Sequence, residues 1–319
     1  MKAKIEIRKD FFLDRYCIIS HSRKLRPKEY KDKGAEVNVK KCFFCPGNEE
    51  PELEIGRLEK NGKWLIRWIR NKYPALLPDF KSVKIFKNGI YERQLGYGFH
   101  EVIVDTPKHG VGIFELSVKE ITQIFKVYQM RYKALKQKEG ISYVVLFKNF
   151  GPKSGASIVH DHTQVIAQPS VPEMVKELAT SFRKLKRDYG CPVCYVIKKE
   201  MRSARRVTSN KHFVSFVPYA PRFANELWVL PRRHILFFEE FTTTELESLA
   251  SIMKKLLTKV MKLTDSFNYV FYPSPSKQKD MHFHIEIYPR TSIWAGYEFA
   301  TNRYIISIPP ERSAEFYRD

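Results

Sequence analysis

The sequence predicts an α+β protein built from two tandem halves, residues 1–170 and 171–319, each with an antiparallel sheet, packed helices and a zinc site. Three observations lead to this prediction. The chain repeats itself at matching intervals, each copy carries an amphipathic helix followed by β-rich runs, and each copy contains a CxxC pair upstream of its histidines. A proline-marked turn and a basic helix at residues 167–190 indicate where the halves meet.

The repeat is clearest in two stretches of matched spacing. "HEVIVDTPKH" runs into "GVGIFELSVKE", and "NELWVLPRRH" runs into "ILFFEEFTTTE". In both, a glutamate is followed after 8 residues by a histidine, His109 or His234, and after 11 more by a second glutamate. Each copy then continues with a capping box, from Ser117 in the first and Thr242 in the second. The apolar residues that follow have helical spacing, so each copy predicts an amphipathic helix whose apolar stripe is core.

The strands follow these helices. A β-rich run, "ISYVVLFKNF" or "FNYVFYP", precedes a strand with alternating histidines, "HDHTQVIA" or "HFHIEIYP". Successive side chains of a strand point to opposite faces of its sheet. We therefore expect His160, His162 and Gln164 to share one face, and Asp161 and Thr163 to share the other.

Four of the five cysteines form two CxxC pairs, "CFFC" and "CPVC". In a reducing compartment such pairs bind metal more often than they form structural disulfides. A redox pair usually opens a helix, and neither pair is followed by a convincing one. Each half supplies two cysteines, then the histidine of the repeat, then the first histidine of the histidine strand, and Cys2His2 is a complete set for structural zinc. The predicted ligands are Cys42, Cys45, His109 and His160 in the first half and Cys191, Cys194, His234 and His282 in the second.

The composition narrows the class of protein. No apolar run approaches the ~20 residues needed to span a bilayer, and the N-terminus lacks the apolar region of a signal peptide, so we expect a cytoplasmic protein. The formal net charge of +21 suits a polyanion or a small anionic substrate. Because Lys and Arg are scattered and no nucleic-acid-binding motif is recognisable, nucleic-acid binding is the less favoured interpretation.

Only the first half has a glycine-containing loop before its histidine strand. "FKNFGPKSGAS" contains Gly151 and Gly155, with Asn149 and Ser157 beside them. Glycines let backbone N–H groups approach a phosphate closely, and Asn and Ser add further donors. The corresponding "YPSPSKQKDM" of the second half has no glycine. The loop therefore predicts a phosphate-binding site in the first half.

The chemistry is expected in the same half. The second half has Glu286 where the first has Gln164, and a carboxylate repels phosphate. With His160 on zinc, His162 is the free imidazole, which can attack phosphorus, while Gln164 donates its amide to a phosphate oxygen. Gln164 has no proton to give to a basic leaving group, which favours a phosphate-terminated leaving group and a transferase over a hydrolase. We expect no covalent intermediate on His284, the counterpart of His162.

These motifs resemble those of the galactose-1-phosphate uridylyltransferase family, a duplicated branch of the histidine-triad superfamily, and in particular its archaeal and ADP-glucose phosphorylase-like members. The resemblance runs from roughly Asp14 to Glu311 and is carried by HxHxQ and the upstream N-x-x-x-x-x-G-x-S run. It implies a histidine-triad-like fold for each half, with His162 as the nucleophile. It also implies that Gln164, Asn149 and Ser157 surround the phosphates.

The resemblance implies further substrate contacts. "SHSRKLRP" is similar to a segment that makes Arg23 and Arg26 candidates for phosphate contacts, and "RNKYPAL" resembles a nucleotide-binding segment that points to Asn71. "AGYE" resembles the segment that reaches the sugar from the partner subunit, which points to Tyr297 and Glu298 and implies a homodimer with its active site near the subunit interface. The following "FATNRY" departs from the hexose-contacting pattern of the family.

The activity that this resemblance implies is transfer of UMP from UDP-glucose to galactose 1-phosphate through a uridylyl-His162 intermediate, so the expected ligands are a nucleotide sugar and a sugar 1-phosphate. One alternative is an ADP-glucose phosphorylase, which would use the same residues with adenylate and inorganic phosphate. The alternative outside enzymes is a zinc-stabilised nucleic-acid-binding protein, suggested by the basic charge and the CxxC pairs.

Overall fold

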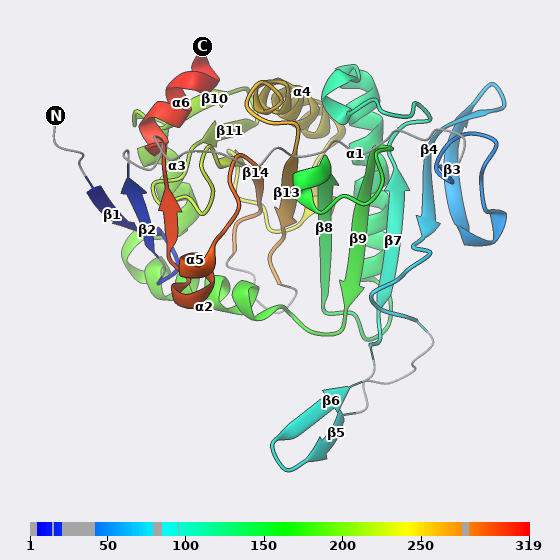
Figure 1. The fold of residues 1–319 in the computed structure, drawn as a ribbon, viewed down its shortest axis with the longest axis horizontal. Helices are drawn as coiled ribbons and strands as arrows, with labels where there is room; N and C mark the ends of the chain where they lie inside the picture. Colours follow the sequence, from blue (N-terminus) through cyan, green and yellow to red (C-terminus); the bar gives the residue numbers. More distant parts are fainter. Residues whose placement is uncertain (1–4, 15, 21–41, 79–84, 95, 276–280) are drawn as a thin grey trace.

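A ten-stranded sheet, antiparallel at every pairing, dominates the computed structural model, which describes residues 5–14, 16–20, 42–78, 85–94, 96–275 and 281–319 (Figure 1). In spatial order its strands are β10 (Arg206–Ser209), β11 (Phe213–Phe216), β12 (Leu227–Pro231), β14 (His284–Pro289), β13 (Phe267–Tyr272), β8 (Tyr143–Phe150), β9 (His162–Gln168), β7 (Phe99–Val104), β4 (Lys63–Arg70) and β3 (Glu54–Lys60). Five strands come from each side of the predicted boundary. The two expected sheets are therefore continuous, joined where β8 pairs with β13.

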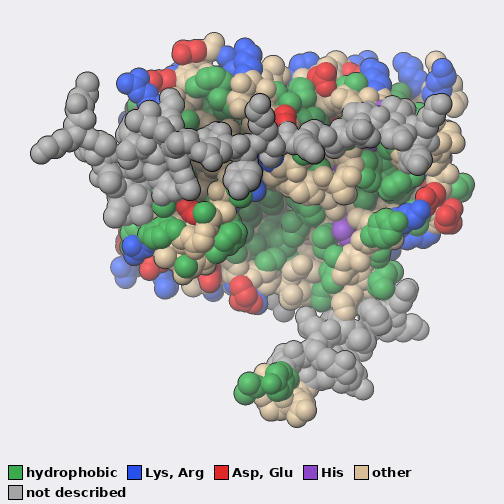
Figure 2. Space-filling model, viewed as in Figure 1, with side chains coloured by type: hydrophobic (Ala, Val, Ile, Leu, Met, Phe, Trp, Pro, Cys, Tyr) green, Lys and Arg blue, Asp and Glu red, His purple; other side chains and the backbone are tan. Residues whose placement is uncertain are grey.

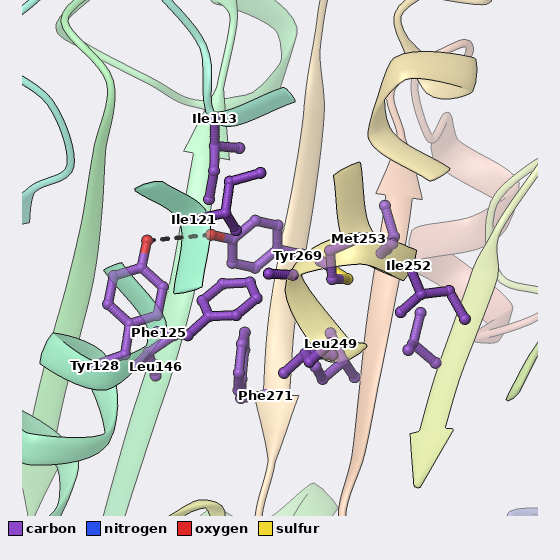
Figure 3. Packing of buried hydrophobic residues seen from close by; sticks show 14 of the residues in the cluster. Ile113, Ile121, Phe125, Tyr128, Leu146, Leu249, Ile252, Met253, Tyr269 and Phe271 are labelled. Carbon is purple, nitrogen blue, oxygen red and sulfur yellow. Dashed lines mark hydrogen bonds between the residues drawn. The ribbon is translucent and has the colours of Figure 1, made fainter. Parts of the chain in front are cut away.

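Two long helices cover one face of this sheet. They are α1 (Val118–Lys136) and α4 (Thr243–Val260), which pack against each other. Both begin at the predicted capping boxes, with Ser117 and Thr242 as the N-caps. Their apolar stripes meet β8 and β13 in the main core (Figure 3). Residues that meet there include Ile121, Phe125, Leu146, Leu249, Met253, Tyr269 and Phe271.

The opposite face is covered unevenly. Over the strands of the second half lie α2 (Glu173–Tyr189) and α3 (Pro192–Glu200), packed through a separate apolar cluster. Over β7 and β9 of the first half lies the Cys42–Cys45 turn. Figure 2 shows this face hollowed in the middle, with hydrophobic side chains across the hollow and a histidine beside it.

The remaining elements are small. A three-stranded sheet joins β1 (Ile5–Lys9), β2 (Tyr16–Ser20) and β15 (Tyr304–Ile306), and the hairpin of β5 (Ile85–Asn88) and β6 (Tyr91–Gln94) stands away from the body (Figure 1). Short helices are η3 (Pro51–Leu53), η4 (Ile113–Glu115), η5 (Pro152–Ser154), η6 (Phe238–Glu240), α5 (Gly296–Thr301) and α6 (Pro310–Arg318). Within the described residues, no helix combines the length and the apolar character that a membrane span requires.

Two details differ from the sequence-based expectations. The "CPVC" pair does open a helix, because Cys191 is the N-cap of α3, its sulfur accepts from the Cys194 N–H, and Pro192 suits the first helical turn. The histidine strands begin at His162 and His284, because regular pairing ends there and the preceding histidine of each pair lies before the strand.

A buried ion cluster lies on the α1 side of the sheet. Lys148 Nζ, fully buried, is 2.5 Å from Asp105 Oδ2 and 2.6 Å from Asp161 Oδ1. Thr163 Oγ1 also donates to Asp105 Oδ2, at 3.0 Å. Burial raises the pKa of the Asp161 carboxyl to about 6, against the opposing effect of the Lys148 ammonium. Asp161 and Thr163 therefore lie on the face opposite the histidines, as predicted, and serve the core.

We expect Lys148→Met to lower the free energy of unfolding by about 3–5 kcal/mol, because the buried carboxylates lose their cation. Urea denaturation measures this loss. The control is Lys176→Met on α2, where an exposed lysine pairs with exposed Glu173 and the loss should stay under about 1 kcal/mol. Equal losses in the two variants would contradict this account of the cluster.

Candidate active site

The first group of metal-ligand side chains gathers where the Cys42–Cys45 turn meets the start of β9. Cys45 Sγ lies 3.3 Å from His109 Nδ1 and 3.5 Å from His160 Nδ1, and Cys42 Sγ lies 3.7 Å from His160 Nδ1. Around a tetrahedral ion with metal–sulfur bonds of about 2.3 Å and metal–nitrogen bonds of about 2.0 Å, neighbouring ligand atoms are about 3.5 Å apart. The four side chains therefore fit one metal ion.

The orientation of His160 suits a metal ligand. Its Nε2–H donates to the Thr106 carbonyl at 2.7 Å, which leaves Nδ1 unprotonated and facing both sulfurs. A second hydrogen bond of this kind fixes the tautomer of a metal-binding histidine and orients its ring. Phe44 packs edge-on against the same ring and is buried with the two cysteines. The structure thus brings together all four residues predicted for the first set.

The second group repeats this arrangement beside α3. Cys194 Sγ lies 3.4 Å from His282 Nδ1 and 3.8 Å from His234 Nδ1, and Cys191 Sγ lies 3.8 Å from His282 Nδ1. His282 Nε2–H donates to the Pro231 carbonyl at 3.2 Å, the counterpart of the bond that orients His160. These four side chains also could hold one metal ion, as the sequence predicts.

His162 is a buried imidazole with one nitrogen available. Its Nδ1–H donates to the His160 carbonyl at 2.8 Å, so the unprotonated Nε2 carries a lone pair. Burial lowers the pKa of His162 to about 4, which keeps the ring neutral at pH 7. A neutral imidazole is the form that can act as a nucleophile. The Phe44 ring, 5.2 Å away between centroids, fixes one side of it.

The corresponding histidine of the second half is enclosed. His284 Nε2 lies 3.4 Å from Glu286 Oε1, and the His284 ring stacks on Tyr272 with 4.9 Å between centroids. Trp228 covers the ring on another side, and Phe12 from the N-terminal segment stacks on Trp228. The sequence predicted that Glu286 would lie beside His284. It did not predict that Phe12 covers Trp228, because these two segments are far apart in the chain.

A cavity of about 490 Å³ opens beside Gln164 and contains the predicted nucleotide residue Asn71. Its lining includes Asn71, Pro74, Leu76, Leu77, Phe99 and His100. His100 connects this cavity to the histidine strand, because its Nε2 lies 2.9 Å from Gln164 Oε1. His100 was missed in the sequence, where "GFHEV" carries no motif. The signal that could have identified His100 was its place in the strand that leads to the predicted metal ligand His109.

The glycine loop follows β8, at the junction where β8 of the first half pairs with β13 of the second. Asn149 Oδ1 accepts from Asn268 Nδ2 at 2.8 Å, and the same amide donates to the Ser154 carbonyl at 2.8 Å. Asn268 belongs to β13, so a residue of the second half holds the predicted phosphate loop of the first. Gly155 and Ser157 remain exposed at the surface of the loop.

The loop contains two glycines that share a positive φ but differ in ψ, which is 164° at Gly151 and 15° at Gly155. Both Gly151 and Gly155 have φ of +82°, but a Cβ on Gly151 would lie 2.1 Å from Asp265 O, whereas one on Gly155 has no atom of the described residues within 4 Å. Gly155→Ala should cost roughly 1–2 kcal/mol through its left-handed backbone alone. We expect Gly151→Ala to cost clearly more, since the loop must also move, and thermal unfolding of both variants measures the difference. Equal losses of stability in the two variants would show that the loop moves away from the new Cβ without cost.

The remaining predicted contacts are not seen beside His162 in the described residues of one chain. Arg23 and Arg26 lie outside the described residues. Tyr297 and Glu298 lie on α5, which contacts β15 and lies away from β9 (Figure 1). Glu298 accepts from the Ala295 N–H at 2.9 Å, which caps this short helix, while Tyr297 is 40% exposed. A role for these two residues at His162 therefore requires a second copy of the chain.

The comparisons with known proteins agree with this arrangement. The family "Galactose-1-phosphate uridyl transferase, N-terminal domain" matches residues 8–172, and a domain of unknown function, DUF4921, matches residues 110–315. The fold and these matches define the protein as a nucleotidyltransferase. The chain belongs to the galactose-1-phosphate uridylyltransferase family.

Individual relatives cover nearly the whole chain. It is 30% identical to the ADP-glucose phosphorylase of Arabidopsis thaliana, over 98% of this chain and 92% of that protein. It is 27% identical to the galactose-1-phosphate uridylyltransferase of Thermotoga maritima, over 99% and 98%. A crystal structure of an Arabidopsis thaliana ADP-glucose phosphorylase with bound ADP-glucose aligns with a TM-score of 0.85 and 28% identity, covering 99% of each chain.

Proposed function

We propose that the protein transfers a nucleotidyl group from a nucleotide sugar to a phosphate-terminated acceptor through a covalent intermediate on His162. The observation that carries this proposal is the buried, neutral His162, whose Nδ1–H is held by the His160 carbonyl and whose Nε2 is therefore available. Nε2 attacks the α-phosphorus and forms a P–N bond. The P–O bond to the sugar phosphate breaks, and the sugar 1-phosphate leaves with the electron pair. An acceptor phosphate oxygen then attacks the same phosphorus and releases His162.

The surrounding residues suit a phosphate leaving group. A sugar phosphate is a weakly basic anion that departs without a general acid, and the Gln164 amide donates hydrogen bonds but no proton. A neutral donor aimed at the phosphate stabilises the charge that develops there. The exposed loop residues Gly155 and Ser157 are proposed as further phosphate contacts, together with Asn149. The nucleotide occupies the cavity that contains Asn71.

Each metal set is proposed to hold zinc. Two thiolates and two imidazoles are the ligands of structural zinc, and a complete set of four leaves no position for substrate. When bound, the ion contributes folding energy and connects distant segments. In the first set, the ion would fix His160, and the His160 carbonyl in turn orients His162 through a hydrogen bond.

Among donors and acceptors, we propose ADP-glucose and inorganic phosphate. Support comes from the 30% identity to the Arabidopsis thaliana phosphorylase and from the likeness to its structure. The second candidate is the UDP-glucose and galactose 1-phosphate reaction, favoured by the family match over residues 8–172.

A direct comparison of kcat/KM for the two pairs of substrates distinguishes the two candidate reactions. We expect ADP-glucose with phosphate to exceed UDP-glucose with galactose 1-phosphate by at least about 10-fold, which corresponds to about 1.4 kcal/mol of transition-state discrimination. A preference of that size in the other direction would assign the uridylyl reaction instead. Exchanging only the acceptor, with the donor held constant, separates selection of the base from selection of the acceptor.

We further propose that a second copy of the chain contributes Tyr297 and Glu298 to the site. Large apolar side chains are exposed around them, with Ile293 at 79% and Phe299 at 74%. Such a patch on a soluble domain commonly marks an interface. Analytical ultracentrifugation of the wild type and of Phe299→Asp should show a dimer that the substitution weakens.

A further inference from the structure

We propose that His100 is a positioning residue that fixes the direction of the Gln164 carboxamide and connects it to the nucleotide cavity. The inference rests on the proposed function, because it assigns Gln164 a place beside the phosphate. His100 itself is not assigned a contact with the reacting atoms. It acts on the reaction through Gln164.

The sheet register brings the two side chains together. In the antiparallel pair of β7 and β9, His100 lies opposite Ile166, and Val102 lies opposite Gln164. His100 and Gln164 are thus diagonal neighbours on one face, a separation that long side chains can bridge. The distance from His100 Nε2 to Gln164 Oε1 is 2.9 Å, and both groups are at least partly buried.

The tautomer of His100 is set from the other side of its ring. The Ala75 N–H donates to His100 Nδ1 at 3.1 Å, so Nδ1 carries no proton and the single proton of the neutral ring is on Nε2. Burial lowers the pKa of His100, which favours the neutral ring. The Nε2–H must then donate to Gln164 Oε1. The direction of this hydrogen bond therefore follows from a backbone contact.

This bond decides what Gln164 presents to a ligand. With Oε1 held by His100, the amide nitrogen is left on the other branch of the carboxamide and supplies the donors. A free carboxamide can turn over, and the reversed orientation would present an oxygen to a phosphate and repel it. Holding the amide in one orientation in advance is the condition under which such a donor contributes most to a reaction.

The same ring contacts the cavity wall. Asn71 Oδ1 accepts from the Tyr73 N–H at 2.8 Å, which fixes the Asn71 amide, and Asn71 Nδ2 lies 3.0 Å from His100 Nε2. The His100 ring therefore lies against Asn71, the residue that the sequence points to for nucleotide binding.

A double-mutant cycle tests the proposal. His100→Phe removes both ring nitrogens, whereas His100→Gln retains a donor at the position of Nε2. In single-turnover transfer of labelled nucleotide to the enzyme, we expect His100→Phe to slow the saturated rate by about 10- to 100-fold and His100→Gln to restore most of it. In a Gln164→Ala background, His100→Phe should slow the rate by less than about twofold, because the residue it positions is absent. Equal slowing in both backgrounds would overturn the proposal.

A second measurement keeps this test separate from the proposed function. If no nucleotide sugar labels the wild type, the proposed function fails, but the His100 geometry can still be examined by ¹⁵N NMR of the histidine rings, assigned through the signal lost in His100→Gln. The proposal requires a protonated Nε2 and an unprotonated, hydrogen-bonded Nδ1. A protonated Nδ1 would overturn it, whatever the activity. Unchanged metal content and melting temperature in His100→Phe exclude a merely structural effect on the rates.

Discussion

His162→Ala should abolish nucleotidyl transfer, with a loss of roughly 10⁴-fold or more, because it removes the imidazole that forms the P–N bond. The same substitution at the matched position of the second half, His284→Ala, should leave transfer within a few-fold of the wild type. His284 Nε2 faces Glu286, and its ring is stacked on Tyr272 and tilted against Trp228, so we expect it to be shielded from a nucleotide. Retention of radiolabel from a nucleotide-labelled donor measures both variants.

The pair of variants controls for burial, because both histidines are buried, are the first residue of a similar strand and donate Nδ1–H to a carbonyl two residues earlier. Circular dichroism and metal content verify that each variant is folded. Should His284→Ala lose its label while His162→Ala keeps it, the reactive half has been assigned wrongly.

Cys42→Ser and Cys191→Ser should each lower the metal content from about two ions per chain to about one, because each removes a ligand from one set of four. Both should be destabilised, since a closed zinc site contributes folding energy directly. Only Cys42→Ser should also slow transfer by roughly 10- to 100-fold or more, because its set contains His160, whose carbonyl holds the nucleophile.

Elemental analysis, urea denaturation and label transfer on the two variants separate these effects. Metal content near zero in wild-type protein kept reduced and away from chelators would contradict the two metal sites. A larger loss of transfer in Cys191→Ser than in Cys42→Ser would contradict the assignment of the reaction to the first half.

The sequence was most informative where the chain is duplicated. Neither His109 nor His234 is recognisable alone as a metal ligand, but their equivalent places in two copies predicted both groups of four, and the structure brings both together. The period of two along a strand likewise predicted that Asp161 and Thr163 would lie on the face away from His162. The capping boxes predicted the starts of α1 and α4.

Contacts between distant segments were not predictable where no repeat or ligand motif marks them. His100 meets Gln164 because of the register of β7 and β9, and no hairpin turn sets this register because α1 and β8 lie between the two strands in the chain. Asn268 holds Asn149 across 119 residues, and Phe12 covers Trp228 from the far end of the chain. The helix after "CPVC" was missed for a different reason, because its start depends on a cysteine sulfur that accepts a backbone hydrogen bond.

The most direct test of a nucleotidyl-His162 intermediate mixes stoichiometric enzyme with ADP-glucose or UDP-glucose labelled in the nucleotide, without acceptor. The account predicts about one equivalent of glucose 1-phosphate released and about one equivalent of acid-labile, base-stable label on His162, discharged when phosphate or a sugar phosphate is added. Continuous release of free AMP or UMP, with no label retained on the protein, would show that water is the natural acceptor and would contradict the account.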